Sequence, residues 1–97
     1  MKFEIKFTPG SEKDLAYFKK YEQKIIISGI KKYLSDDANV ETNRKKQLRP
    51  NELAPWELRI GNYRVFYDIE ETNLVKIIAI GLKVHNELFI RGKRVEL

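Results

Sequence analysis

The chain has 97 residues, enough for one domain with one modest hydrophobic core, and its 19 lysines and arginines against 14 acidic residues give a net charge of +5. It contains no cysteine and one histidine, which excludes disulfide scaffolds, thiol catalysis and a metal site built from cysteine or histidine clusters. The basic balance favours polyanions or acidic proteins as partners, although many inert small domains are equally basic.

The first ten residues, MKFEIKFTPG, predict a strand and not a signal peptide. Phe3, Ile5 and Phe7 alternate with polar residues, as in a half-buried strand, and no continuous apolar stretch is present. No apolar run elsewhere approaches the length that spans a bilayer. We therefore expect a cytoplasmic protein that does not contact membranes.

A first helix is predicted after the Thr8-Pro9-Gly10 break. Ser11 stands three residues before Asp14, which resembles a capping box and indicates a helix start, and the helix is expected to run to about Lys20.

A second helix is predicted from apolar residues at helical spacing, namely Ile26, Ile30, Tyr33 and Leu34. Gly29 inside this pattern indicates close packing on something flat, such as a sheet. Tyr17, Tyr21 and Tyr33 are expected in the apolar stripe of the two helices rather than in a base-stacking platform.

A polar connection follows, with Arg44, Lys45, Lys46 and Arg49 in it. On its own such a run of charge is typical of a solvated face. Lys45, Lys46 and Arg49 are nevertheless candidates for binding an anionic substrate.

The remainder of the chain is rich in strand patterns. Residues 56–60 and 63–69 alternate on either side of Gly61-Asn62, which reads as a two-residue hairpin turn with glycine first. Residues 74–82 are almost wholly apolar, which is typical of a central strand.

Beyond Asn86 the pattern is ambiguous, and Leu88, Ile90 and Val95 suit a short final strand with Gly92 as a break. The order β-α-α-β-β-β predicts a single α+β domain over residues 1–97. Its two-helix hairpin is expected on one face of a mainly antiparallel sheet.

A turn at Gly61-Asn62 fixes the register of the hairpin. One face then pairs apolar residues: Ile60 with Tyr63, Leu58 with Val65, and Trp56 with Tyr67. The other face pairs Arg59 with Arg64, and Glu57 with Phe66. Arginines directly opposite each other destabilise a sheet, so either Glu57 screens them or they hold an anion such as phosphate. The alternative is a pair of solvated arginines splayed apart on an exposed face.

Lys83 joins this face under one condition. With a two-residue loop at Glu71-Thr72, Arg64 faces Ala79 and Lys83 has the parity of the two arginines, whereas a three-residue loop sends Lys83 to the opposite face. His85 lies just beyond the strand and is a candidate for proton transfer.

Such a face suits RNA cleavage by the neighbouring 2′-hydroxyl, which requires a base, cations for the phosphorane oxygens and an acid for the leaving oxygen. Arg59, Arg64 and Lys83 supply the charge, and Glu57 or His85 supplies proton transfer. The chain has no phosphate-binding glycine loop, nucleophile elbow or dinucleotide fingerprint to suggest other chemistry, and no dense set of carboxylates accompanies its single histidine, so we expect no cofactor and no metal.

The stretch LRIGNYRVFYD at residues 58–68 resembles the central hairpin of the RelE/ParE toxin superfamily, and IGLK at residues 80–83 resembles its following strand and basic exit. The resemblance covers essentially the whole chain and implies the same order of helices and strands. Its RelE branch, which we favour, implies a ribosome-dependent, metal-independent mRNA endoribonuclease acting in the ribosomal A site. Arg64 matches the hairpin arginine of such toxins.

Three positions depart from the usual pattern of RelE-like enzymes. Lys83 stands where an arginine is often found, Glu57 where a lysine is common, and Phe89 where several place a catalytic tyrosine. These departures leave Glu57 and His85 as the nearby acid–base candidates.

The resemblance leaves two other functions open. In the ParE branch the same scaffold poisons DNA gyrase and does not cut nucleic acid, and a degenerate member is harmless. In each case the resemblance implies a cognate antitoxin that wraps the toxin in a hetero-oligomer. The basic residues 44–49 and the sheet face are expected to contact it by charge complementarity.

Overall fold

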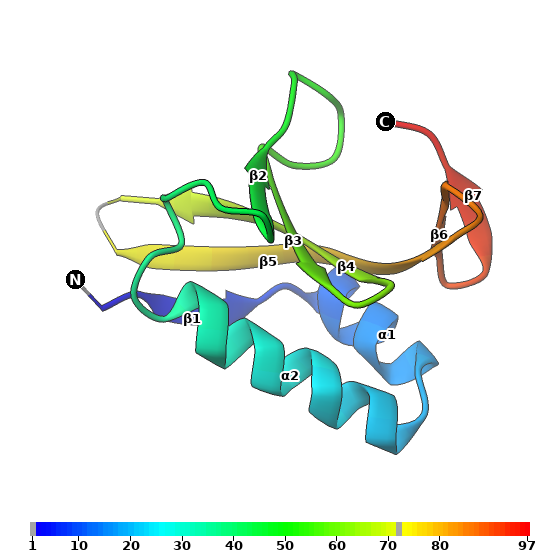
Figure 1. The fold of residues 1–97 in the computed structure, drawn as a ribbon. Helices are drawn as coiled ribbons and strands as arrows, with labels where there is room; N and C mark the ends of the chain where they lie inside the picture. The colour runs from blue at the N-terminus through cyan, green and yellow to red at the C-terminus, as the bar shows by residue number, and fades with distance from the viewer. Residues whose placement is uncertain (1, 72) are drawn as a thin grey trace.

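The computed structural model describes residues 2–71 and 73–97, which form two helices and a seven-stranded sheet (Figure 1). The elements in chain order are β1 (Glu4–Phe7), α1 (Pro9–Tyr17), α2 (Lys20–Leu34), β2 (Lys45–Gln47), β3 (Trp56–Ile60), β4 (Tyr63–Glu70), β5 (Leu74–Val84), β6 (Glu87–Ile90) and β7 (Lys93–Val95). Both helices lie below the sheet in Figure 1, which confirms the α+β class and the helical hairpin on one face.

Strand β5 is the centre of the sheet, as its apolar sequence predicts. The sheet order is β2-β3-β4-β5-β6-β7 with antiparallel pairing throughout, and β1 joins β5 in parallel. One edge of β5 pairs with β4, and the other edge is shared end to end by β1, at residues 74–77, and β6, at residues 82–84.

Helix α1 begins three residues earlier than the sequence suggested. Thr8 is the N-cap: its hydroxyl accepts a hydrogen bond from Ser11 N at 3.1 Å, and the Ser11 hydroxyl accepts one from Thr8 N at 2.9 Å. The prediction of a capping box from Ser11 to Asp14 was therefore wrong. Thr8 also donates to the Ile77 carbonyl at 2.9 Å, and Pro9 follows it at a position that suits proline, so the start of the helix is tied to β5.

Asp14 is instead used to complete the sheet. Its buried carboxylate accepts a hydrogen bond from Ile80 N at 3.0 Å, on the stretch of the β5 edge between β1 and β6. The other oxygen of Asp14 lies 2.8 Å from Arg91 Nε, in the turn between β6 and β7. One side chain thus links α1, the central strand and the C-terminal hairpin.

Helix α2 packs on the sheet through the residues predicted for it. Ile26, Ile30 and Leu34 are fully buried, and a Cβ atom at Gly29 would lie 2.4 Å from Ile60 Cδ1, which confirms close helix–sheet packing at this glycine.

The prediction for the tyrosines was only partly right. Tyr33 packs against the core, but Tyr17 and Tyr21 are 58% and 62% exposed. Tyr17 reaches the C-terminal hairpin, where a Cβ atom at Gly92 would lie 2.9 Å from its hydroxyl oxygen.

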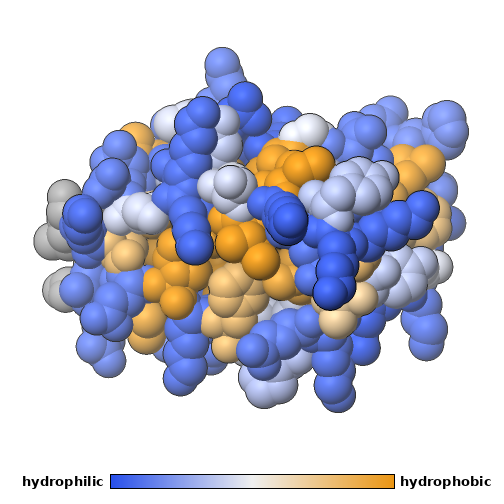
Figure 2. Space-filling model, turned by 90° about the horizontal axis from the view of Figure 1, so that it is seen from below, coloured by the Kyte–Doolittle hydropathy of each residue, from blue (hydrophilic) through white to orange (hydrophobic). Residues whose placement is uncertain are grey.

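The helical side carries an exposed apolar patch surrounded by hydrophilic residues (Figure 2). Phe7, Leu15, Ala16 and Ile27 line a shallow groove formed by β1, α1 and α2. Neither helix in the described part of the chain combines the length and the apolar character needed to cross a membrane.

The register of the β3–β4 hairpin is the predicted one. Gly61 adopts a φ of +56°, and the structure pairs Ile60 with Tyr63 and Arg59 with Arg64. It also pairs Leu58 with Val65, Trp56 with Tyr67, and Glu57 with Phe66.

The register of β4 and β5 differs from the prediction in an informative way. Arg64 faces Gly81 and not Ala79. Glu70 pairs with Leu74, so three residues connect the strands, and the prediction of a two-residue loop was wrong. Thr72, one of the two residues of the predicted loop, lies outside the described residues. A bulge between Phe66 and Tyr67 shifts the register by one more residue, and the two shifts together keep Lys83 on the face of the arginines.

The second sheet face is partly covered. Ala54, Phe66, Ala79 and Leu88 form a small buried cluster, and Leu48, Leu53 and Val95 pack around it. The cover consists of the connection before β3 and the β6–β7 hairpin. Strand β2 could not be predicted because the segment KKQ has no apolar alternation, and the C-terminal hairpin has only the ambiguous pattern noted above.

A candidate binding site on the sheet face opposite the helices

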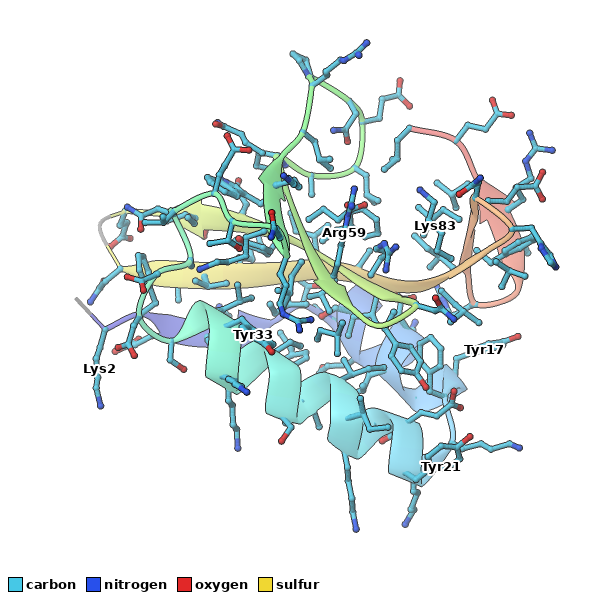
Figure 3. The ribbon with its side chains drawn as sticks, in the orientation of Figure 1. Lys2, Tyr17, Tyr21, Tyr33, Arg59 and Lys83 are labelled. Carbon is cyan, nitrogen blue, oxygen red and sulfur yellow. The ribbon has the colours of Figure 1, made fainter. Side chains whose placement is uncertain are left out.

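The candidate site lies on the sheet face that points away from α1 and α2. Arg59 and Lys83 project from this face, between the connection that follows β2 and the C-terminal hairpin (Figure 3). A cavity of about 390 Å³ opens here. Its lining comes from Glu57 and Lys83 on the sheet and from residues 86–88 and 94–97 of the hairpin and the end of the chain.

Two turns and one glycine bring the hairpin over the sheet. Both turns, at His85-Asn86 and at Arg91-Gly92, place two successive residues at positive φ, which matches the twist that a two-residue hairpin requires. A Cβ atom at Gly81 would lie 2.6 Å from the carbonyl oxygen of Phe89, so only glycine lets the hairpin approach β5 this closely. The wall of the cavity therefore depends on these local features of the sequence.

Glu57 offsets the charge of the opposed arginines. It is only 6% exposed, and its Oε1 accepts a hydrogen bond from Arg59 Nε at 3.0 Å. The Arg64 Nη1 group donates to the carbonyls of Gly61 at 2.8 Å and Tyr63 at 3.0 Å. Of the three possibilities raised by the sequence, the geometry shows the screened arrangement, in which Glu57 is bonded to Arg59.

Burial lowers the pKa of the Arg64 guanidinium, the carboxylate of Glu57 opposes this shift, and the neighbouring Arg59 adds to it. An arginine nevertheless stays protonated at neutral pH. The face therefore keeps both positive charges beside the single carboxylate.

Lys83 and His85 occupy different places. Lys83 lines the cavity together with Glu57, as its parity on β5 requires. His85 is exposed at a φ of +50° in the β5–β6 turn and is not part of the lining. The structure does not bring the histidine to the two arginines.

The three basic residues of the polar connection that were predicted to bind substrate lie in three different environments. Lys45 is buried, and its Nζ donates to the Asp37 carbonyl at 2.5 Å, so it is occupied within the fold. Lys46 pairs with Glu57 across β2 and β3 and lies on the site face. Arg49 is exposed in the connection that follows, beside hollows other than the cavity under the C-terminal hairpin.

Residues of the C-terminal hairpin were not predicted as part of the site. Arg94 lies 3.8 Å from Glu87 and also pairs with Glu96, and all three line the cavity. No motif marks these residues, and only the path of the hairpin brings them to the sheet. Across residues 2–71 and 73–97, no three side chains of the kinds that ligate metals are grouped to hold an ion.

Phe89 stands where several RelE-like enzymes place a catalytic tyrosine, but its side chain does not point to the candidate site. It pairs with Leu82, whereas Lys83 pairs with Leu88, so Phe89 faces the side opposite to Lys83. Its aromatic ring is not part of the cavity lining.

Comparison with known proteins places the chain in one branch of the superfamily. Residues 5–83 match a family model described as "ParE toxin of type II toxin-antitoxin system, parDE". No individual curated protein matches the sequence. The match is to ParE toxins, which corrects the preference for the RelE branch, and it ends at Lys83, before the C-terminal hairpin.

Proposed function

Because the chain belongs to the ParE toxin family of type II toxin–antitoxin systems, we propose that it is a toxin that inhibits DNA gyrase by binding it and does not cleave RNA. Family membership implies a cognate antitoxin as its partner. Gyrase as the target is what the ParE branch implies for this scaffold.

The screened arginine pair is the observation that carries the proposal. Cleavage of RNA requires free cations that stabilise the charge building on the phosphorane. In this chain Arg59 is bonded to Glu57, and Arg64 donates to two backbone carbonyls. These bonds occupy Nε of Arg59 and Nη1 of Arg64 and leave other N–H groups of each guanidinium unused, but the carboxylate of Glu57 offsets the positive charge that a scissile phosphate requires.

The placement of acid–base groups supports the same conclusion. His85 lies in an exposed turn outside the cavity, and Phe89 is on the other side of the sheet. Glu57, the remaining proton-transfer candidate, is already engaged with Arg59. A surface with these properties suits binding better than proton transfer.

A supercoiling assay tests the proposal. Purified protein is expected to block supercoiling of relaxed plasmid by gyrase and to leave mRNA intact on translating ribosomes at the same concentration. Addition of the antitoxin should restore gyrase activity. Position-specific mRNA cuts together with unaffected supercoiling would contradict gyrase inhibition.

A ribosome-dependent mRNA interferase is the second candidate function. It is favoured by four cations from four adjacent strands on one sheet face, namely Lys46, Arg59, Arg64 and Lys83. If this function holds, Arg64→Ala should strongly weaken the cuts. Expression without antitoxin and without growth arrest would instead identify a harmless member of the family.

The antitoxin is proposed to contact the basic connection in the cytoplasm. Arg49 is exposed there, and the Arg44 guanidinium lies over the ring of Tyr33 at 4.7 Å, where it remains open to solvent. An acidic antitoxin segment complements both charges in a hetero-oligomer.

A further inference from the structure

We propose that the cavity under the C-terminal hairpin binds an extended acidic segment of a protein partner, with a carboxylate of that segment on Lys83. The inference deepens the proposed function and rests on it in one respect, namely that the target is a protein.

Lys83 is the exception in a cavity whose other charged side chains are paired. Glu57 is bonded to Arg59, and Arg94 lies between the two glutamates of the C-terminal segment. No acidic oxygen of the described residues comes within 4.0 Å of the Lys83 ammonium group. A cation in a recess with no partner of its own is complementary to an incoming anion.

The rest of the lining favours a peptide over a nucleic acid. Leu88, Val95 and the exposed Leu97 offer apolar surface, whereas Glu87 and Glu96 carry negative charge. A nucleic-acid strand brings a phosphate at every nucleotide, and phosphates beyond the one on Lys83 would meet these glutamates. A peptide can present one carboxylate to Lys83 and an apolar side chain to the leucines and the valine.

The edge of the sheet indicates how such a segment would lie. Strand β7 is the last in the sheet order, so its outer edge pairs with no strand of the described chain. An extended segment that adds to this edge makes main-chain hydrogen bonds, and its alternate side chains point to the same side. The expected sequence is therefore an acidic residue and an apolar residue two positions apart.

A titration followed by NMR tests the cavity directly. The probe is a capped hexapeptide with glutamate at position 2, valine at position 4 and serine at the other positions, and the comparison ligands are the same peptide with lysine in place of glutamate and a single-stranded DNA oligomer with three phosphates. We expect the glutamate peptide to shift amides of residues 83–97 and to bind at least about tenfold more weakly to Lys83→Gln, as for loss of a charge-assisted hydrogen bond. Lys76→Gln is the matched control, because Lys76 lies on the same strand but is paired with Glu70.

Two results would overturn the inference. One is glutamate-peptide binding that is equal in wild type and Lys83→Gln. The other is tighter, Lys83-dependent binding of the DNA oligomer, which would assign the cavity to nucleic acid.

The supercoiling assay separates this inference from the proposed function. If wild type and Lys83→Gln inhibit gyrase equally, gyrase inhibition stands and the role of the cavity in it falls. If the wild type leaves gyrase active but binds the peptide through Lys83, the proposed function falls and the acidic-segment site stands.

Discussion

At the scale of single residues, Glu57 explains how the sheet tolerates two arginines directly opposite each other. Its buried carboxylate is bonded to Arg59 and also attracts Arg64. Glu57→Gln should therefore lower the free energy of unfolding. Because Arg59 is 46% exposed, water weakens the interaction, and the loss should be about 1 kcal/mol or less.

Salt provides the check on this explanation. Repulsion between the unscreened arginines should make Glu57→Gln gain more stability than the wild type as ionic strength rises in urea unfolding experiments. An equal response of the two proteins to salt would show that Glu57 acts through packing alone.

Tyr63 gives a second residue-scale prediction, one that depends on pH. Its hydroxyl donates to Glu22 Oε2 at 2.7 Å, and this bond, together with that from Lys19 N, lowers the pKa of Glu22. Burial and the same bond raise the pKa of Tyr63 to about 12. Because the pKa of Glu22 is lowered in the folded protein, its ionised form contributes stability at neutral pH, and this stability is lost as pH falls through that lowered pKa. Because the pKa of Tyr63 is raised, its protonated form contributes stability that is lost as pH rises through about 12.

Tyr63→Phe should therefore be less stable than the wild type at pH 7. The difference should shrink as pH falls through the lowered pKa of Glu22, because Glu22 is then protonated in both proteins. Urea unfolding of the two proteins at pH 7 and pH 3 measures it. A difference that is the same at both pH values would mean that the hydroxyl acts independently of Glu22.

At the scale of elements, the C-terminal hairpin depends on a glycine beneath it. A methyl group at Gly81 would meet the backbone oxygen of Phe89 at 2.6 Å, and this oxygen cannot rotate away as a side chain can. Gly81→Ala should lower stability by about 1–3 kcal/mol and displace β6 from β5. Thermal unfolding and the amide shifts of residues 87–95 measure both effects.

Gly10→Ala is the control for this substitution. The added methyl group at position 10 has its nearest contact, Ile78 O, at 4.0 Å, and alanine also favours the helix. Loss of stability in both variants to the same extent would argue against a specific role for the close approach at Gly81.

The link between α1 and the hairpin is a second prediction for the elements. Asp14 accepts from Ile80 N and pairs with Arg91, so Asp14→Asn and Arg91→Gln should each destabilise the protein. Because the two side chains are in contact, their effects should be less than additive, with a coupling of roughly 0.5–3 kcal/mol in a double-mutant cycle. Additive losses would mean that Asp14 serves only the β5 edge.

At the scale of the whole molecule, stability should be graded outward from β5. This strand has neighbours on both edges, and Ile77 and Ile80 are fully buried in it, whereas β7 closes the sheet with one neighbour. Native-state hydrogen exchange should therefore be slowest in β4 and β5 and fastest, among the strands, in β7. Equal protection of β5 and β7 would indicate that the sheet opens as one unit.

The sequence predicted the parts of the fold that local rules determine. The apolar alternation around Gly61-Asn62 was sufficient for the register of β3 and β4, and with it the opposition of Arg59 and Arg64. The position of Lys83 was predicted through the wrong loop, since neither the three-residue connection nor the bulge at Phe66 has a marker in the sequence.

Residues whose roles depend on distant segments could not be predicted. Lys45 looked like part of a solvated basic run, yet the pairing of β2 with β3 buries it against the Asp37 carbonyl. Asp14 looked like part of a helix cap, yet its carboxylate accepts a hydrogen bond from Ile80 N, between the stretches of β5 that pair with β1 and β6. The cavity forms only because the C-terminal hairpin folds back on the sheet, and no local sequence pattern predicts how the hairpin is placed.

The shared edge of β5 has a consequence for how this protein can diversify. Strand β1 and the C-terminal hairpin occupy separate stretches of that edge, and the hairpin lies beyond the residues that match the family. A change in the hairpin that keeps Leu88, which is buried with Phe66, and Arg91, which pairs with Asp14, should therefore leave the pairing of β1, β3 and β4 intact while it reshapes the wall of the cavity. Substitutions in this segment can therefore change which partner the cavity binds while the strands that match the family keep their sequence.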